Sequence, residues 1–89
     1  MAEGWGKHTP ERCKFYAALG AEIKRVRLAK RLTRKEVCGR VGVVGPTLWG
    51  YETGRGGFMS LEMLCRLGDA LECNPCDWLR AAAGELGEA

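Results

Sequence analysis

The chain has 89 residues, of which 46% are hydrophobic and 28% charged, and its formal net charge is +3. This length fits one compact domain with a thin core, and the composition is ordinary for a soluble globular protein. No apolar run approaches the roughly 20 residues needed to cross a bilayer, and the first residues lack the basic and apolar regions of a secretion signal, so we expect a cytoplasmic protein with no membrane partner.

Charge is distributed unevenly along the chain. Residues 1–55 carry 12 Lys and Arg against five Asp and Glu, a balance of +7, whereas residues 56–89 carry two against six, a balance of −4. Such asymmetry favours one face for a polyanion and another turned away from it. The alternative is a set of solvated helix faces, which is the commoner origin of a Lys- and Arg-rich segment.

The first predicted helix follows a tail. Residues 1–8 show no periodicity and are predicted to be a flexible N-terminal tail. Thr9-Pro10-Glu11 is a helix-start pattern, with a capping hydroxyl, Pro at the first position and an acid in the first turn. Gly20 indicates either a break in this helix or close packing against another one. Apolar residues then recur at steps of three and four, at Phe15, Leu19, Ile23 and Val26.

The second helix, over residues 34–41, has the clearest boundaries. Thr33-Arg34-Lys35-Glu36 is a capping box, in which Thr33 caps the helix and Glu36 returns to the backbone of Thr33. Gly42 suits the left-handed position that ends a helix. The helix is therefore only about two turns long.

Three more helices are predicted. The third starts at Gly45-Pro46 and ends at Gly54, with Leu48 and Tyr51 inward. Ser60 caps the fourth, which has a Leu stripe, and a short fifth follows Asn74-Pro75. No strand pattern is present. The helical domain is predicted to span residues 9–80, with a short C-terminal tail over residues 81–89.

Two short helices joined by a tight turn form the helix-turn-helix arrangement. The residue order resembles the XRE/Cro-type family of phage and bacterial repressors, which implies an all-α, five-helix, lambda-repressor-like DNA-binding domain. The resemblance covers Leu19 to Leu79. The matching strings are Leu19-Gly20-x-x-Ile23-Lys24-x-Val26-Arg27, Leu32-Thr33-x-x-x-Val37-Cys38, Gly42-Val43-x-x-x-Thr47-Leu48-x-x-Tyr51-Glu52-x-Gly54 and Ser60-Leu61-Glu62-x-Leu64-x-x-Leu67-x-x-Ala70-Leu71.

The chain departs from the family pattern within the motif. Arg34 stands where Gln is frequent, and Val44 stands where the cap of the third helix is usually Ser. The third helix also offers few polar side chains, with no Arg, Asn or Gln between Gly45 and Glu52. DNA discrimination is therefore expected to depend on thymine methyl contacts and DNA shape.

The resemblance implies a DNA contact surface. The third helix would enter the major groove, with base-contact candidates Pro46, Thr47, Trp49 and Gly50. For Trp49 the alternative is an aromatic residue in the core or in a dimer interface. Arg27 and Glu52 match a helix-bridging ion pair, the alternative being two independent surface charges. Phosphate-contact candidates, which would otherwise form a solvated basic surface, are Arg34, Lys35, Arg40, Thr53 and Arg55.

The five cysteines raise a metal or redox hypothesis. Cys73-Asn74-Pro75-Cys76 supplies two ligands, whereas structural zinc needs four. His8 and Cys13 could complete a site only if the N-terminal tail folded back. Cys38, Cys65 and Cys73 fall on positions where the family has small apolar residues. We therefore predict no metal site, no cofactor and five reduced thiols.

The pattern does not bring together a nucleophile, a base and a pocket, so we do not expect an enzyme. The predicted function is sequence-specific binding of double-stranded DNA by a transcriptional regulator, in particular a repressor acting as a homodimer on a two-fold operator. The alternative is a helix-turn-helix module that binds a protein partner, as an antitoxin or anti-repressor does.

Overall fold

The computed structural model describes residues 10–55 and 59–85, and within these ranges the secondary structure is entirely helical. The expected all-α class with five helices is confirmed. The helices are α1 (Pro10–Ala29), α2 (Arg34–Val41), α3 (Gly45–Thr53), α4 (Leu61–Leu71) and α5 (Pro75–Glu85).

The bounds of α2 follow from its side chains. The Thr33 hydroxyl accepts a hydrogen bond from the Glu36 backbone N–H at 3.1 Å, and the Glu36 carboxylate accepts one from the Thr33 N–H at 2.8 Å. The second of these bonds holds the pKa of Glu36 below its ordinary value, because the backbone N–H of Thr33 stabilises the ionised carboxylate. At the other end Gly42 has φ +87°, the left-handed conformation that glycine adopts readily. The predicted range of 34–41 is confirmed.

The last helix is longer than the sequence pattern predicted. Helix α5 continues to Glu85, so the domain boundary placed after residue 80 lies within a helix. Ala82 is fully buried, and α5 packs against α1 and α4. Contact with α1 therefore stabilises residues that the pattern assigned to a tail.

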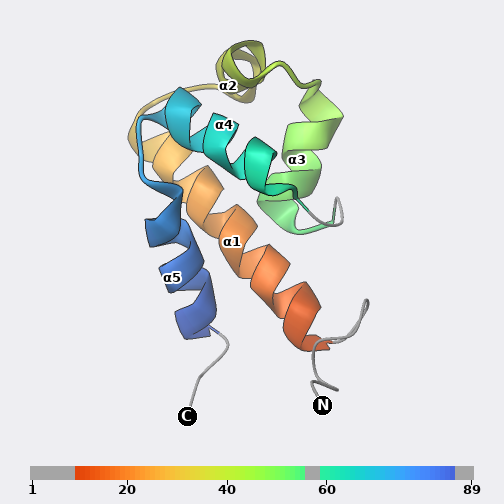
Figure 1. Ribbon diagram of the computed structural model, residues 1–89. Helices are drawn as coiled ribbons and strands as arrows, with labels where there is room; N and C mark the ends of the chain where they lie inside the picture. The colour runs from red at the N-terminus through yellow and green to blue at the C-terminus, as the bar shows by residue number, and fades with distance from the viewer. Residues whose placement is uncertain (1–9, 56–58, 86–89) are drawn as a thin grey trace.

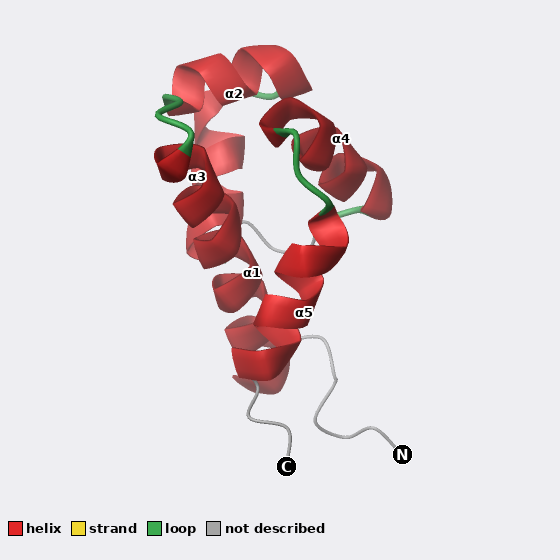
Figure 2. Cartoon of the chain, turned by 90° about the vertical axis from the view of Figure 1, so that its left-hand side faces the viewer, coloured by secondary structure: helices red, strands yellow, loops and turns green. Residues whose placement is uncertain are grey.

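The five helices surround one core. Helix α1 crosses the molecule, with α5 along one side and α3 on another, while α2 and α4 pack together (Figures 1 and 2). Helices α1 and α5 are far apart in sequence and lie side by side in both views. The largest fully buried side chains are Trp78, Ile23, Leu48, Leu67, Leu71 and Val37.

Close packing at Gly20 sets the position of α3. Helix α1 runs without a break through Gly20. A Cβ built on Gly20 would lie 2.0 Å from the Tyr51 carbonyl oxygen and 2.8 Å from the Glu52 carbonyl carbon. Of the two alternatives for this glycine, close packing against another helix is therefore the one present. The absent side chain lets the backbones of α1 and α3 meet.

Candidate nucleic-acid interface

Helix α3 has one buried face and one face open to solvent. Leu48 and Glu52, four residues apart, are 0% and 3% exposed. Gly45, Pro46 and Trp49 are exposed and lie together in one sector of the helix surface, because positions i, i+1 and i+4 fall within about 100° around a helix. Glu52, about 60° from Trp49, lies at the edge of this sector. Val44, the N-cap residue, is 66% exposed and makes no side-chain capping bond. We call Val44, Gly45, Pro46 and Trp49 the exposed α3 face.

The predicted base-contact residues differ in their exposure to solvent. Thr47 and Gly50 were expected to share the outward face, but Thr47 is half-buried and Gly50 is buried. The prediction took Leu48 and Tyr51 as the centre of the inward face. Gly50 is buried as well, so the inward face extends toward Gly50 and Thr47, and the outward face is centred on Trp49. Pro46 and Trp49 are the predicted residues that remain exposed.

Glu52 is the centre of a three-residue charge cluster. Its carboxylate accepts hydrogen bonds from Arg27 Nε at 2.6 Å and Arg27 Nη2 at 3.2 Å. Both side chains are buried, and Arg27 Nη1 also donates to the Leu32 carbonyl at 2.9 Å. The ion pair expected between Arg27 and Glu52 is thus present, and it joins α1, α3 and the segment before α2.

Arg34 is the third member of this cluster. Its Nε donates to Glu52 Oε1 at 2.9 Å, and 39% of its side chain is exposed. Since the contact with Glu52 uses Nε, the terminal Nη groups are the ones that an incoming phosphate would meet. The first residue of α2 is in this way held beside α3.

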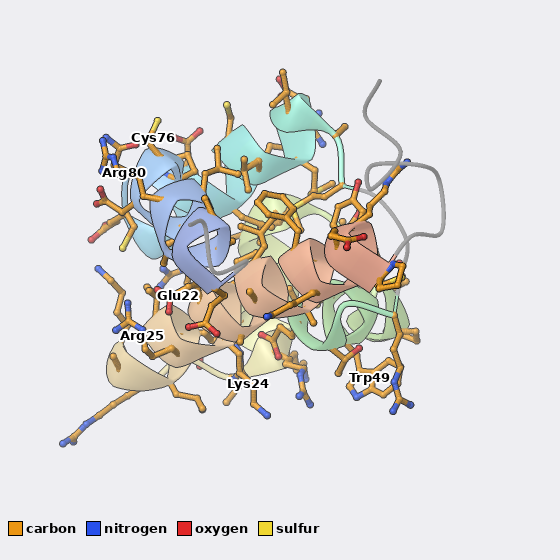
Figure 3. The ribbon with its side chains drawn as sticks, turned by 90° about the horizontal axis from the view of Figure 1, so that it is seen from below. Glu22, Lys24, Arg25, Trp49, Cys76 and Arg80 are labelled. Carbon is orange, nitrogen blue, oxygen red and sulfur yellow. The ribbon has the colours of Figure 1, made fainter. Side chains whose placement is uncertain are left out.

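Arg55 lies beside the exposed α3 face. Its guanidinium carbon is 5.7 Å from the centroid of the Trp49 ring. Such cation–π contacts contribute about 0.5–1 kcal/mol at exposed sites, enough to favour one position of a long side chain. Figure 3 shows Trp49 projecting from the body of the protein, and Lys24 of α1 projects from the same side.

Lys24 was not among the predicted site residues. It is exposed and lies four residues after Gly20 and three before Arg27, both of which contact α3. The helical spacing of three and four residues places Lys24 on the α3-facing side of α1. The sequence contains this spacing, but the spacing indicates a position beside α3 only when Gly20 and Arg27 are known to face that helix.

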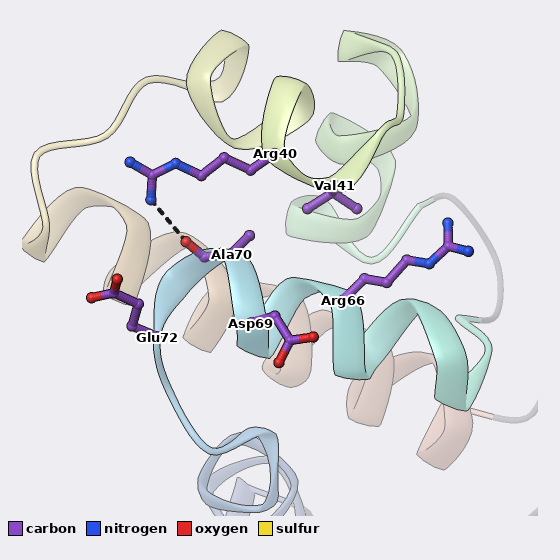
Figure 4. A pocket seen from close by; sticks show the side chains of 6 residues that line it. All are labelled: Arg40, Val41, Arg66, Asp69, Ala70 and Glu72. Atoms are coloured by element: carbon purple, nitrogen blue, oxygen red, sulfur yellow. Dashed lines mark hydrogen bonds between the residues drawn. The ribbon is translucent and has the colours of Figure 1, made fainter.

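Two predicted phosphate contacts have other partners. The Thr53 hydroxyl donates to the Trp49 carbonyl at 2.9 Å, so its proton is already used within α3, and a phosphodiester can only accept. Arg40 Nη1 donates to the Ala70 carbonyl at the end of α4, 2.9 Å away, in a hollow that α2 and α4 form (Figure 4). Arg40 lies roughly 120° around α2 from Arg34. Lys35 is exposed beside Arg34.

The cysteines occupy different environments. Cys38 is buried in the core and Cys73 packs against the core from its edge, whereas Cys13, Cys65 and Cys76 are exposed. Within residues 10–55 and 59–85, no three His, Cys, Asp or Glu side chains gather as a metal site would require. His8, the remaining candidate ligand, lies outside the described residues.

We expect all five thiols to be reduced and metal-free in protein purified under reducing conditions. The buried Cys38 acts as a small apolar core residue, and two Cys-x-x-Cys ligands are too few for structural zinc. Thiol titration of unfolded protein should count five groups per chain. One zinc per chain by elemental analysis would contradict this expectation.

Known proteins contain the same arrangement of helices. Residues 18–84 match the family described as "Helix-turn-helix domain". The clp gene regulator ClgR of Corynebacterium glutamicum is 33% identical in one crystal structure, over 79% of this chain and 90% of that one, with a TM-score of 0.73. A second ClgR structure is 32% identical, over 82% and 77% of the two chains, with a TM-score of 0.75.

A more distant structure shares the fold alone. The restriction-modification controller protein C.AhdI of Aeromonas hydrophila is 24% identical, over 71% of this chain and 94% of that one, with a TM-score of 0.67. The comparison with curated proteins gave no match. Across residues 10–55 and 59–85, no helix combines the length and apolarity needed to span a bilayer.

Five helices, with a short capped α2 leading through a tight turn to a half-exposed α3, define a DNA-binding transcription regulator. The chain belongs to the helix-turn-helix domain family. Its resemblance to XRE/Cro-type regulators is confirmed.

Proposed function

We propose that this regulator recognises a specific duplex sequence with α3 in the major groove, and that it represses transcription as a homodimer on a two-fold operator. The observation that carries the proposal is the exposed α3 face with Arg34 and Arg55 beside it. A major groove about 12 Å wide admits one α-helix, and flanking phosphates need cations on either side of that helix. The +7 balance of residues 1–55 fits the same partner.

The test begins with DNA immediately upstream of the protein's own gene. Footprinting should show protection of two half-sites about 34–36 Å apart, one turn of the duplex, as expected for a dimer. A reporter driven by that DNA should lose expression when the protein is present. Protection of one half-site by a species that remains monomeric in light scattering would remove the homodimer from the proposal, and increased expression would remove repression.

Trp49→Ala should lower affinity for the protected sequence and leave affinity for random duplexes nearly unchanged. Trp49 is 43% exposed and central to the exposed α3 face, so its removal changes groove contacts more than the core. Affinities for the two duplexes are compared at one salt concentration, with thermal unfolding as the control for folding. If specific affinity is kept in full, α3 does not contact bases through Trp49.

Arg34→Ala should weaken binding to all duplexes alike and reduce the slope of log affinity against log salt by about 0.9, the value for one lost phosphate contact. Arg80→Ala is the matched control, because Arg80 is an exposed arginine on α5 paired with Asp77 at 2.8 Å. Titrations at several salt concentrations give the slopes. A changed sequence preference with an unchanged slope would make Arg34 a base contact instead.

The apolar character of the exposed α3 face favours a second candidate, binding of a protein partner. Val44 and Trp49 are 66% and 43% exposed, and large exposed apolar residues that cluster mark interaction sites. Salt-dependent binding to duplex DNA separates the two candidates. A protein that binds no duplex at low salt would support the partner-binding module and exclude the DNA-binding function.

A further inference from the structure

The exposed α3 face is poor in hydrogen-bonding groups. From Val44 to Thr53 the sequence contains no Asn, Gln, Lys or Arg, the side chains that make bidentate base contacts. Thr47 is half-buried, and the Thr53 hydroxyl donates to the Trp49 carbonyl. What remains outward is the apolar surface of Val44, Pro46 and the Trp49 ring, with one indole N–H.

An apolar surface has one counterpart on base edges in the major groove, the methyl group at C5 of a pyrimidine. Thymine carries this methyl, and 5-methylcytosine carries it at the same place. The Trp49 ring offers a broad apolar plane to such a group. Unmethylated cytosine and purines present no methyl group there, so the exposed α3 face can distinguish pyrimidines by methylation.

Arg55 adds a hydrogen-bonding group beside the same plane. Its guanidinium lies over the Trp49 ring, 5.7 Å from the centroid. A guanidinium placed against an aromatic face keeps its N–H groups directed outward along its edge. Two of those donors match O6 and N7 of guanine, the commonest specific base contact of arginine.

We propose that this protein recognises a 5-methylpyrimidine followed by guanine, with the methyl group packed on Trp49 and the guanine bound by Arg55. Thymine and 5-methylcytosine both satisfy the first position, so methylation of cytosine in a cytosine–guanine step creates a binding site. This inference rests on the proposed DNA-binding function. It assigns Arg55 to a base edge instead of the phosphate predicted from sequence.

A protein occupant explains the charges beside this face less well. Apart from Arg55, which is assigned to the guanine, Arg34 lies beside this face and Lys24 projects from the same side of the molecule as Trp49. An apolar strip bordered by cations is complementary to methyl groups between two rows of phosphates. An uncharged apolar protein surface would offer no anion to the terminal groups of Arg34 or to Lys24.

The test first selects preferred sequences from random duplexes with the full chain. One selected duplex is then made in four forms that differ at a single pyrimidine: thymine, 2′-deoxyuridine, cytosine or 5-methylcytosine, each with its complementary base. Removing the methyl should weaken binding about fourfold in both pairs, the value of one buried methyl group. Arg55→Ala should lose roughly fivefold or more of the preference for guanine at the next position.

Trp49→Ser should reduce both methyl ratios to one while non-specific binding keeps its salt dependence, and Arg80→Ala should leave both ratios unchanged. Equal wild-type affinity for thymine and deoxyuridine, and for 5-methylcytosine and cytosine, would overturn the proposal without any variant. So would selected sequences that lack a pyrimidine–guanine step. In either case, salt-dependent binding of the selected duplex leaves the DNA-binding function in place. Failure to bind any duplex overturns both.

Discussion

Glu52→Gln should destabilise the fold by about 3–5 kcal/mol, the cost of removing one partner from a buried ion pair. The Glu52 side chain is 0% exposed, and that of Arg27 is 7% exposed. Gln keeps the shape of the side chain but leaves the buried Arg27 charge uncompensated. A domain of this size has a total stability of about 5–15 kcal/mol, so a large share of it is at stake.

Urea unfolding followed by circular dichroism measures this effect. Glu62→Gln is the matched control, because the Glu62–Arg66 pair on α4 is mostly exposed and such pairs contribute about 0–1 kcal/mol. Replacing Arg27 and Glu52 together with Met should recover much of the loss, since no buried charge then lacks a partner. Equal effects of Glu52→Gln and Glu62→Gln would contradict the structural role of the cluster.

Gly20→Ala should destabilise the protein by about 1–3 kcal/mol or more, because the added methyl group overlaps backbone atoms. The Cβ would lie 2.0 Å from the Tyr51 carbonyl oxygen, so α1 and α3 must separate. Displacement of α3 should also lower specific DNA affinity. This variant therefore couples loss of stability to loss of the binding surface.

Gly39→Ala should have the opposite effect on the stability of the same protein. Gly39 lies inside α2, and nothing comes within 4 Å of a Cβ built on it. Ala is favoured over Gly in a helix by about 0.5–1 kcal/mol, so this variant should be more stable than the parent. Thermal unfolding of the two variants gives the comparison. A Gly20→Ala protein as stable as Gly39→Ala would show that α1 and α3 do not meet as described.

The sequence predicts helices best where capping residues determine them. Thr33, Glu36 and Gly42 bound α2 through local hydrogen bonds and one left-handed residue, so its limits follow from neighbours in the chain. The end of α5 depends on the packing of Ala82 against distant elements. An Ala-rich segment fits a buried helix and a frayed end equally well, so the sequence does not show where this helix ends.

The orientation of α3 shows why the candidate site was harder to predict. A carboxylate is usually placed outward when a helix is divided into faces, yet Glu52 points inward because Arg27 is there to receive it. The resemblance to a family predicts that pair, whereas the burial of Gly50 and the half-burial of Thr47 follow only from the packed structure. Arg55 was predicted as a cation near the motif, and only the folded chain places it over Trp49.

The bond between Arg34 and Glu52 has a consequence for the entropy of binding. A free arginine on a surface loses rotamer freedom when it contacts a phosphate, at a cost of about 0.5–1.5 kcal/mol for each ordered side chain. Arg34 is restrained through Nε at 2.9 Å before any DNA arrives. Much of its ordering therefore takes place during folding, so a phosphate contact by the terminal groups of its guanidinium would cost little further rotamer freedom.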